Sequence, residues 1–213
     1  MSSPHLIFDL DGTLIDSSPS ILASMAAALA ARGMPPKVEL HSRLIGPPLL
    51  TTLGIISGES DPILLAALAE DFKAQYDSRG YQETRVMDGV QATLAALHAA
   101  GVRLFIVTNK RIHPTRLILA HLGWSAWFER VYAPDCVSPR FPSKAAAISA
   151  LIADAGLDPA ACLYIGDTPE DEAAARAAGT GFRRAGWGYG DWESPLPAGE
   201  NLATPADLLP TAA

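Results

Sequence analysis

Short apolar runs alternate with helical patterns along most of this chain, whereas one long stretch is helical throughout. Buried strands are expected at the apolar runs 5–8, 102–107 and 162–165. Runs at 130–133 and 181–184 indicate two further short strands. Strands and helices that follow one another through short turns form a parallel sheet.

Helices of the alternating part begin near polar residues or prolines and mostly end at glycines. They are expected at 89–100 with Asp88 as N-cap, 114–122, 144–155 with Ser143 as N-cap, 169–178 and 203–209. Helices on both faces of a parallel sheet predict an α/β fold with a Rossmann-like core.

The long helical stretch spans residues 16–85 and shows no strand pattern. Helices are expected in it at 19–32, 38–45, 47–56 and 61–79, the last opened by Asp61-Pro62. This stretch separates the first strand from the rest of the sheet. We therefore expect an all-helical insertion at 16–85 in a discontinuous core of 1–15 and 86–213.

Composition narrows the class of protein without naming a function. Hydrophobic residues make up 49% of 213 and charged residues 18%, which is typical of a globular chain. The net charge of −7, with no cluster of Lys and Arg, argues against a nucleic-acid partner. No apolar segment approaches the ~18 residues of a membrane span, and no signal sequence is evident. We expect a cytoplasmic protein with no membrane partner.

Polar clusters follow three of the expected strands. They are Asp9-Leu10-Asp11-Gly12-Thr13, Thr108-Asn109 and Gly166-Asp167-Thr168-Pro169-Glu170-Asp171. Ligands of open parallel sheets bind beyond the carboxyl ends of the strands, where these clusters meet, and Lys144 at a helix start can face the same edge. Each cluster alone also fits an ordinary turn or helix start; together they favour one shared site.

Asp9 and Asp11 suggest the chemistry of that site. A buried carboxylate is costly, and a second one nearby adds repulsion unless a cation or a proton compensates. A solvated Asp-Gly turn is the alternative for this pair taken alone. A divalent cation held by carboxylates would offset the negative charge of a phosphate monoester, and Mg²⁺ suits a site built from oxygen ligands.

This ordered set of residues resembles the haloacid dehalogenase superfamily, especially its phosphatases. The resemblance rests on Asp9-Leu10-Asp11-Gly12-Thr13, Thr108, Lys144 and Gly166-Asp167 with Asp171, in that order. The insertion at 16–85 resembles the helical cap of phosphoglycolate-phosphatase-like members. Gly46-Pro47-Pro48-Leu49 and Gly186-Trp187-Gly188-Tyr189 are similar to the same subgroup.

The resemblance implies a role for each of these residues. Asp9 attacks phosphorus and becomes an aspartyl phosphate, while Asp11 protonates the leaving oxygen and later activates water. Asp9, the main-chain carbonyl of Asp11 and Asp167 bind Mg²⁺. The remaining implied roles are phosphate binding by Thr108 and the Asn109 main chain, charge compensation by Lys144, and orientation of metal waters or Lys144 by Asp171.

The lysine departs from the commonest family pattern. Related phosphatases often carry Lys-Pro-x-Pro ahead of the helix, whereas Lys144 here opens the helix after Ser138-Pro139-Arg140-Phe141-Pro142-Ser143. Arg140 is the rival cation nearby, and we assign the role to Lys144.

A phosphatase acting on a small phosphorylated metabolite is therefore the leading hypothesis. Asp11 separates it from a dehalogenase, because a leaving halide needs no proton. A phosphomutase and a non-enzymatic phospho-acceptor or binding module are the alternatives. The substrate, the roles of Arg43 and Lys73 in the insertion, and the oligomeric state are not specified by the sequence.

Overall fold

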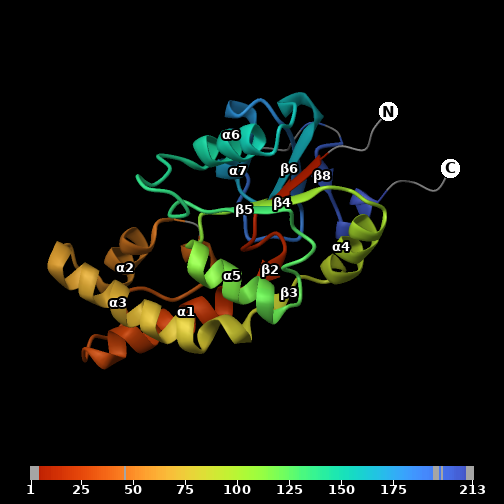
Figure 1. The fold of residues 1–213 in the computed structure, drawn as a ribbon. Helices are drawn as coiled ribbons and strands as arrows, with labels where there is room; N and C mark the ends of the chain where they lie inside the picture. Colours follow the sequence, from red (N-terminus) through yellow and green to blue (C-terminus); the bar gives the residue numbers. More distant parts are fainter. Residues whose placement is uncertain (1–4, 46, 194–196, 198, 210–213) are drawn as a thin grey trace. The chain divides into compact units, whose positions relative to one another are not determined.

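The computed structural model describes residues 5–45, 47–193, 197 and 199–209. Contacts within the chain divide it into two compact units, one of residues 1–16 and 86–213 and one of residues 17–85. The ribbon in Figure 1 shows the elements of each unit.

The larger unit contains a sheet of six strands in the order β5-β4-β1-β6-β7-β8, and every neighbouring pair is parallel. The strands are β1 (His5–Phe8), β4 (Leu104–Val107), β5 (Arg130–Tyr132), β6 (Cys162–Gly166), β7 (Gly181–Ala185) and β8 (Asn201–Leu202). This sheet confirms the predicted α/β fold class.

Helices cover both faces of the sheet, as Figure 1 shows. They are α4 (Val90–Ala99), α5 (Ile112–His121), α6 (Lys144–Asp154) and α7 (Pro169–Ala177). The chain steps from β1 to β4 to β5 on one side of β1, and then returns to β6 and β7 on the other. Because such crossovers are right-handed, this reversal puts α4 and α5 on one face and α6 and α7 on the other.

The core between the sheet and α6 and α7 fixes the ends of the central strands. Ile7, Phe105 and Tyr164 on three adjacent strands are fully buried, and Ile148 and Leu151 of α6 pack against them. Each such apolar side chain contributes about 1.5–3 kcal/mol when fully buried. The carboxyl ends of β1, β4 and β6 are therefore set in a rigid frame.

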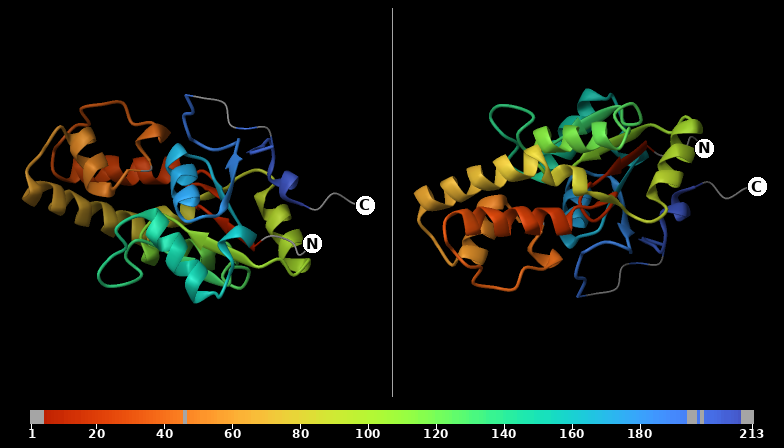
Figure 2. Two further views of the ribbon diagram at one scale, coloured as in Figure 1. Left: turned by 90° about the horizontal axis from the view of Figure 1, so that it is seen from above. Right: turned by 90° about the horizontal axis from the view of Figure 1, so that it is seen from below.

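The smaller unit consists of α1 (Ser18–Ala31), α2 (Leu49–Ser57) and α3 (Pro62–Ser78), with the 3₁₀ turns η1 (Ser42–Leu44) and η2 (Gly80–Glu83). Figure 2 shows α1 and α3 side by side. Leu29, Leu53 and Leu68, one from each helix, are fully buried together. Asp61 caps α3 through the main-chain N–H of Ile63, as the sequence predicts.

Several local predictions differ from the structure. The helix expected at 38–45 is reduced to η1, in which the Leu44 and Ile45 N–H groups donate to carbonyls three residues back. The N-cap of α4 is Gly89, with a φ of 80°, and not Asp88. The helix expected at 203–209 is the short 3₁₀ turn η4 (Pro205–Leu208).

The short strands at the two ends of the insertion were not expected. β2 (Ile15–Asp16) and β3 (Arg85–Val86) form a separate two-stranded sheet. Two residues are too few to show an alternating pattern. No single helix in the described part of the chain is long and apolar enough to cross a membrane; α2 and α3 meet that test only as a pair bent by 107°.

Candidate active site

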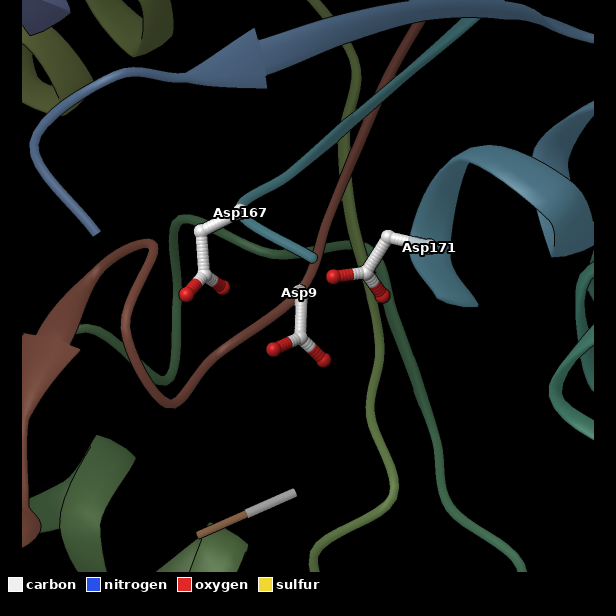
Figure 3. A group of neighbouring side chains, drawn as sticks. All are labelled: Asp9, Asp167 and Asp171. Atoms are coloured by element: carbon white, nitrogen blue, oxygen red, sulfur yellow. The ribbon is translucent and has the colours of Figure 1, made fainter. Parts of the chain in front are cut away.

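Asp9 and Asp167 directly follow two adjacent strands, β1 and β6, at the same edge of the sheet. Phe8 of β1 lies opposite Ile165 of β6, and the Asp9 N–H donates to the Ile165 carbonyl at 2.8 Å. Asp167 directly follows β6, and both aspartates are buried. Figure 3 shows the Asp9 carboxylate between those of Asp167 and Asp171. One oxygen of each of the three lies within 4.8 Å of the others, close enough to share a cation.

Asp171 is fixed by the first turn of α7. The Thr168 main-chain N–H and hydroxyl both donate to Asp171 Oδ2, at 3.1 and 2.7 Å. In return the Asp171 N–H donates to the Thr168 hydroxyl, which completes a capping box. Gly166 makes room for this turn, because a Cβ there would lie 2.5 Å from that of Asp171.

Lys144 connects two of the three carboxylates. It is the first residue of α6, and its ammonium donates to Asp9 Oδ1 at 3.0 Å and to Asp171 Oδ1 at 2.5 Å. Only 8% of Lys144 is exposed, although a lysine at a helix start is normally solvated. The two carboxylates, rather than the helix, therefore determine where this charge lies. The rival cation Arg140 is exposed.

Burial and neighbouring charges shift the pKa of each of the three carboxylates. Burial, together with the neighbouring carboxylates and against the attraction of Lys144, raises the pKa of Asp9 to about 8. Burial and then Asp171 raise the pKa of Asp167 to about 6. Burial also acts to raise the pKa of Asp171, but the charge and hydrogen bond of Lys144 outweigh it and the pKa falls.

These observations fit a divalent cation at the site. If all three carboxylates were ionised, the one ammonium would leave two negative charges uncompensated in a buried place. A divalent ion supplies that charge, and carboxylate oxygens are the ligands that hard cations such as Mg²⁺ prefer. The residues present therefore suit the predicted cofactor.

Asp11 lies on the loop after β1 and is bound by a residue that sequence reasoning missed. The Lys110 ammonium lies 2.9 and 3.2 Å from the two Asp11 carboxylate oxygens, and the Lys110 side chain is only 7% exposed. The metal-binding atom predicted for Asp11 is its main-chain carbonyl oxygen. Its carboxylate is instead directed to Lys110.

Thr108 and Asn109 follow β4, the strand that pairs with β1 on the side opposite β6. Thr108 is buried, and its hydroxyl accepts the Lys110 N–H at 3.2 Å. Asn109 is exposed, and its amide donates to Glu170 Oε1 at 3.2 Å. The polar cluster after β4 thus lies at the same edge of the sheet as Asp9 and Asp167.

Two further partners of the site had no role assigned from the sequence. The Thr13 hydroxyl donates to Asp167 Oδ1, and the Tyr164 hydroxyl donates to the Val107 carbonyl beside Lys144. The sequence did carry a signal for Lys110, because this residue directly follows Thr108-Asn109 in a polar cluster at a strand end. Tyr164 carries no such signal, since it reads as one more apolar residue of a buried strand.

Lys73 and Arg43 lie in the insertion, and the sequence does not specify their roles. Lys73 forms an exposed ion pair with Glu70 at 2.6 Å, and Arg43 lies in η1. Within Gly46-Pro47-Pro48-Leu49, Gly46 lies outside the described residues, and Pro48 is the N-cap of α2.

Comparison with known proteins agrees with this geometry. The family model of haloacid dehalogenase-like hydrolases matches residues 6–185. A phosphoglycolate phosphatase of Xylella fastidiosa is 36% identical over 185 residues, covering 86% of this chain and 80% of the relative. The tyrosine-protein kinase PtkA of Mycobacterium tuberculosis is 36% identical over 191 residues, covering 88% of this chain and 64% of the kinase.

Solved structures share the fold. A haloacid dehalogenase-like hydrolase from Streptococcus pneumoniae superposes with a TM-score of 0.82 at 23% identity, covering 97% of this chain and 96% of that one. Because the family model spans most of the sequence, and the relatives match it over more than four-fifths of its length, this chain belongs to the haloacid dehalogenase-like hydrolase family.

Proposed function

We propose that this protein is a Mg²⁺-dependent phosphatase that hydrolyses small phosphate monoesters through a phosphorylated Asp9. The observation that carries the proposal is the buried group of Asp9, Asp167 and Asp171 around Lys144, with oxygens of the three carboxylates within 4.8 Å of one another. The named phosphatases among the relatives support the same reaction class.

Asp9, the Asp11 carbonyl and Asp167 would hold the cation. When bound, it would neutralise charge on the phosphoryl oxygens and on Asp9, which otherwise repel each other. Asp171 is assigned a different role, because Lys144 and Thr168 occupy its two oxygens. It holds Lys144 in place, and Lys144 in turn offsets negative charge on the transferred group.

The first step transfers the phosphoryl group to Asp9. An Asp9 carboxylate oxygen forms a bond to phosphorus while the bond to the ester oxygen breaks, and Asp11 gives that oxygen its proton. Thr108 and the Asn109 main chain hold the phosphoryl oxygens. In the second step Asp11 takes a proton from water, and the water oxygen forms a bond to phosphorus. The bond between the Asp9 oxygen and phosphorus breaks, which releases phosphate and restores the Asp9 carboxylate.

The insertion at 16–85 is proposed to act as a cap that selects the leaving group. The core residues named above contact only the phosphoryl group and the ester oxygen, so discrimination must come from elsewhere. Phosphoglycolate is the first substrate to test, because several relatives are named for it.

Phosphoryl transfer to another acceptor is the competing function, and the kinase among the relatives gives it weight. A phosphomutase would return the phosphoryl group to a substrate, and a phospho-acceptor module would keep it on Asp9. Asp11 favours hydrolysis over the module, because it stands two residues from Asp9 and can activate water.

The test is turnover of p-nitrophenyl phosphate and of phosphoglycolate by the full chain, with and without Mg²⁺. We expect many turnovers per molecule, abolished by EDTA and restored by excess Mg²⁺. Incubation with ATP and a tyrosine peptide checks the kinase reaction. Phosphopeptide without free phosphate, or a single phosphorylation of Asp9 without release, would overturn the phosphatase proposal.

The contact between Lys110 and Asp11 is expected to support proton donation by Asp11. Lys110→Met should lower kcat about tenfold for alkyl phosphates, because one charge-assisted contact of about 1.5 kcal/mol that orients Asp11 is lost. For p-nitrophenyl phosphate, whose leaving group needs little proton donation, the first step should be far less affected. Stopped-flow measurement of that step for both substrates, with Lys110→Arg as the charge-retaining control, checks this. An increase in KM alone would mean that Lys110 binds substrate instead.

A further inference from the structure

The glycine-rich segment 186–192, Gly-Trp-Gly-Tyr-Gly-Asp-Trp, has no role in the reaction described above. It follows β7, the strand next to β6, and Asp167 directly follows β6. In Figure 3 the chain that leaves β7 bends back on the side of Asp167.

Hydrogen bonds from this segment fix both the carboxylate and the main-chain carbonyl of Asp167. The Tyr189 main-chain N–H donates to Asp167 Oδ2 at 2.8 Å, and the Trp192 indole N–H donates to the Asp167 carbonyl at 2.8 Å. The Trp187 indole donates to the Thr13 carbonyl at 2.9 Å, and the Thr13 hydroxyl donates to Asp167 Oδ1 at 3.1 Å. Each carboxylate oxygen thus has one donor and keeps a further lone pair for a cation.

The glycines of the segment allow it to approach this closely. A Cβ on Gly188 would lie 2.2 Å from the Asp167 Cβ and 2.6 Å from the Gly12 carbonyl oxygen. A Cβ on Gly190 would lie 1.8 Å from the Asp167 carbonyl oxygen. Neither glycine has a φ in the left-handed region, so space, and not backbone conformation, requires glycine here.

We propose that segment 186–192 is the positioning loop of the cation site, which holds Asp167 in the orientation that binds the metal. The proposal rests on the proposed function, because it presumes a cation at Asp9 and Asp167. A carboxylate whose two oxygens and carbonyl are all fixed loses little rotational freedom on binding an ion. Partners of this kind typically change metal affinity by about 10–100-fold when removed.

Two variants and a matched control test the loop. Trp192→Phe removes the donor to Asp167 while an aromatic ring remains against Phe182 and Arg184. Gly188→Ala places a methyl group against Asp167. Gly181→Ala is the control, because its Cβ would meet the end of the Leu163 side chain at 3.1 Å, outside segment 186–192. All three are made in the full chain, and circular dichroism checks that each is folded.

The readout is Mg²⁺ affinity by isothermal titration calorimetry, without substrate. We expect binding about fivefold weaker in Trp192→Phe and at least about tenfold weaker in Gly188→Ala, with Gly181→Ala close to the unmodified chain. Folded Trp192→Phe protein with unchanged affinity would overturn the proposal, even if Gly188→Ala failed to fold. Equal losses in the two glycine variants would show a general packing effect and also overturn it. If the unmodified chain takes up no Mg²⁺, the metal-dependent function itself fails.

Discussion

Replacing Asp9 by asparagine should remove turnover and, in metal-free protein, make the fold more stable. Asparagine keeps the shape of the side chain but cannot form the phosphoryl ester, so kcat should fall by on the order of 10⁴-fold or more. Burial and the adjacent carboxylates raise the pKa of Asp9 to about 8, so its ionised form is unfavourable in the folded state. The asparagine side chain carries no such charge, and Lys144 keeps Asp171 as a partner at 2.5 Å.

The stability change has a defined pH dependence. Between the unfolded pKa of about 4 and the folded value of about 8, the native state binds more protons at Asp9 than the unfolded state does. The free energy of unfolding of the unmodified protein therefore falls as pH rises through this window, by on the order of a few kcal/mol. Asp9→Asn should not show this fall, because it has no carboxyl group at this position. Its gain in free energy of unfolding over the unmodified protein should therefore be small near pH 4 and largest near pH 8.

Thermal unfolding in EDTA at pH 5 and pH 8 measures the effect. A gain of 1 kcal/mol corresponds to about 2–4 °C in Tm for a chain of this size. Asp71→Asn, which removes a surface partner of Arg32, is the control and should leave both kcat and the pH dependence unchanged. Lower stability of Asp9→Asn at pH 8 would contradict the electrostatic description of the site, whereas residual turnover would contradict Asp9 as nucleophile.

The parts of this molecule that were predicted correctly depend on local sequence. An apolar run followed by Asp9-Leu10-Asp11 or Gly166-Asp167 marks both a strand and its end, and parallel topology then brings such ends to one edge. The capping of α6 by Ser143 and of α3 by Asp61 was also predictable, because each cap bonds to a main-chain N–H only two or three residues further along the chain.

The parts that were missed depend on contacts between residues far apart in sequence. Lys144 was assigned to the site from the sequence, but its burial depends on the distant Asp9 and Asp171. Lys110 meets Asp11 across neighbouring strands, and the approach of Gly188 to Asp167 depends on the turn after β7. None of these contacts leaves a periodic pattern in the sequence. We propose that side chains of the insertion select the leaving group, and no sequence motif specifies these side chains.

Lys144→Met is expected to have the second largest effect on stability and turnover. It also tests whether Lys144 or Arg140 is the catalytic cation. Methionine has a similar length but no charge, so Asp9 and Asp171 lose their shared partner. Removing one member of a buried ion pair typically costs about 3–5 kcal/mol, because the remaining charge stays buried and unpaired. The loss of charge beside the transferred phosphoryl group should also lower kcat by about 10²–10³-fold.

The pH dependence of this loss follows from Asp171. Burial alone would raise its pKa, but Lys144 and Thr168 hold it below the usual value, so this carboxylate stabilises the fold above its unfolded pKa of about 4. Lys144→Met should therefore be most destabilised at neutral pH and recover part of the loss as the carboxylates become protonated near pH 4. Urea unfolding at pH 4 and pH 7, together with kcat at saturating substrate, measures both effects. Arg140→Ala should match the unmodified protein in each measurement, because Arg140 is exposed. If Arg140→Ala lost activity and folded Lys144→Met retained it, the catalytic cation would be Arg140, and the buried ammonium would serve stability alone.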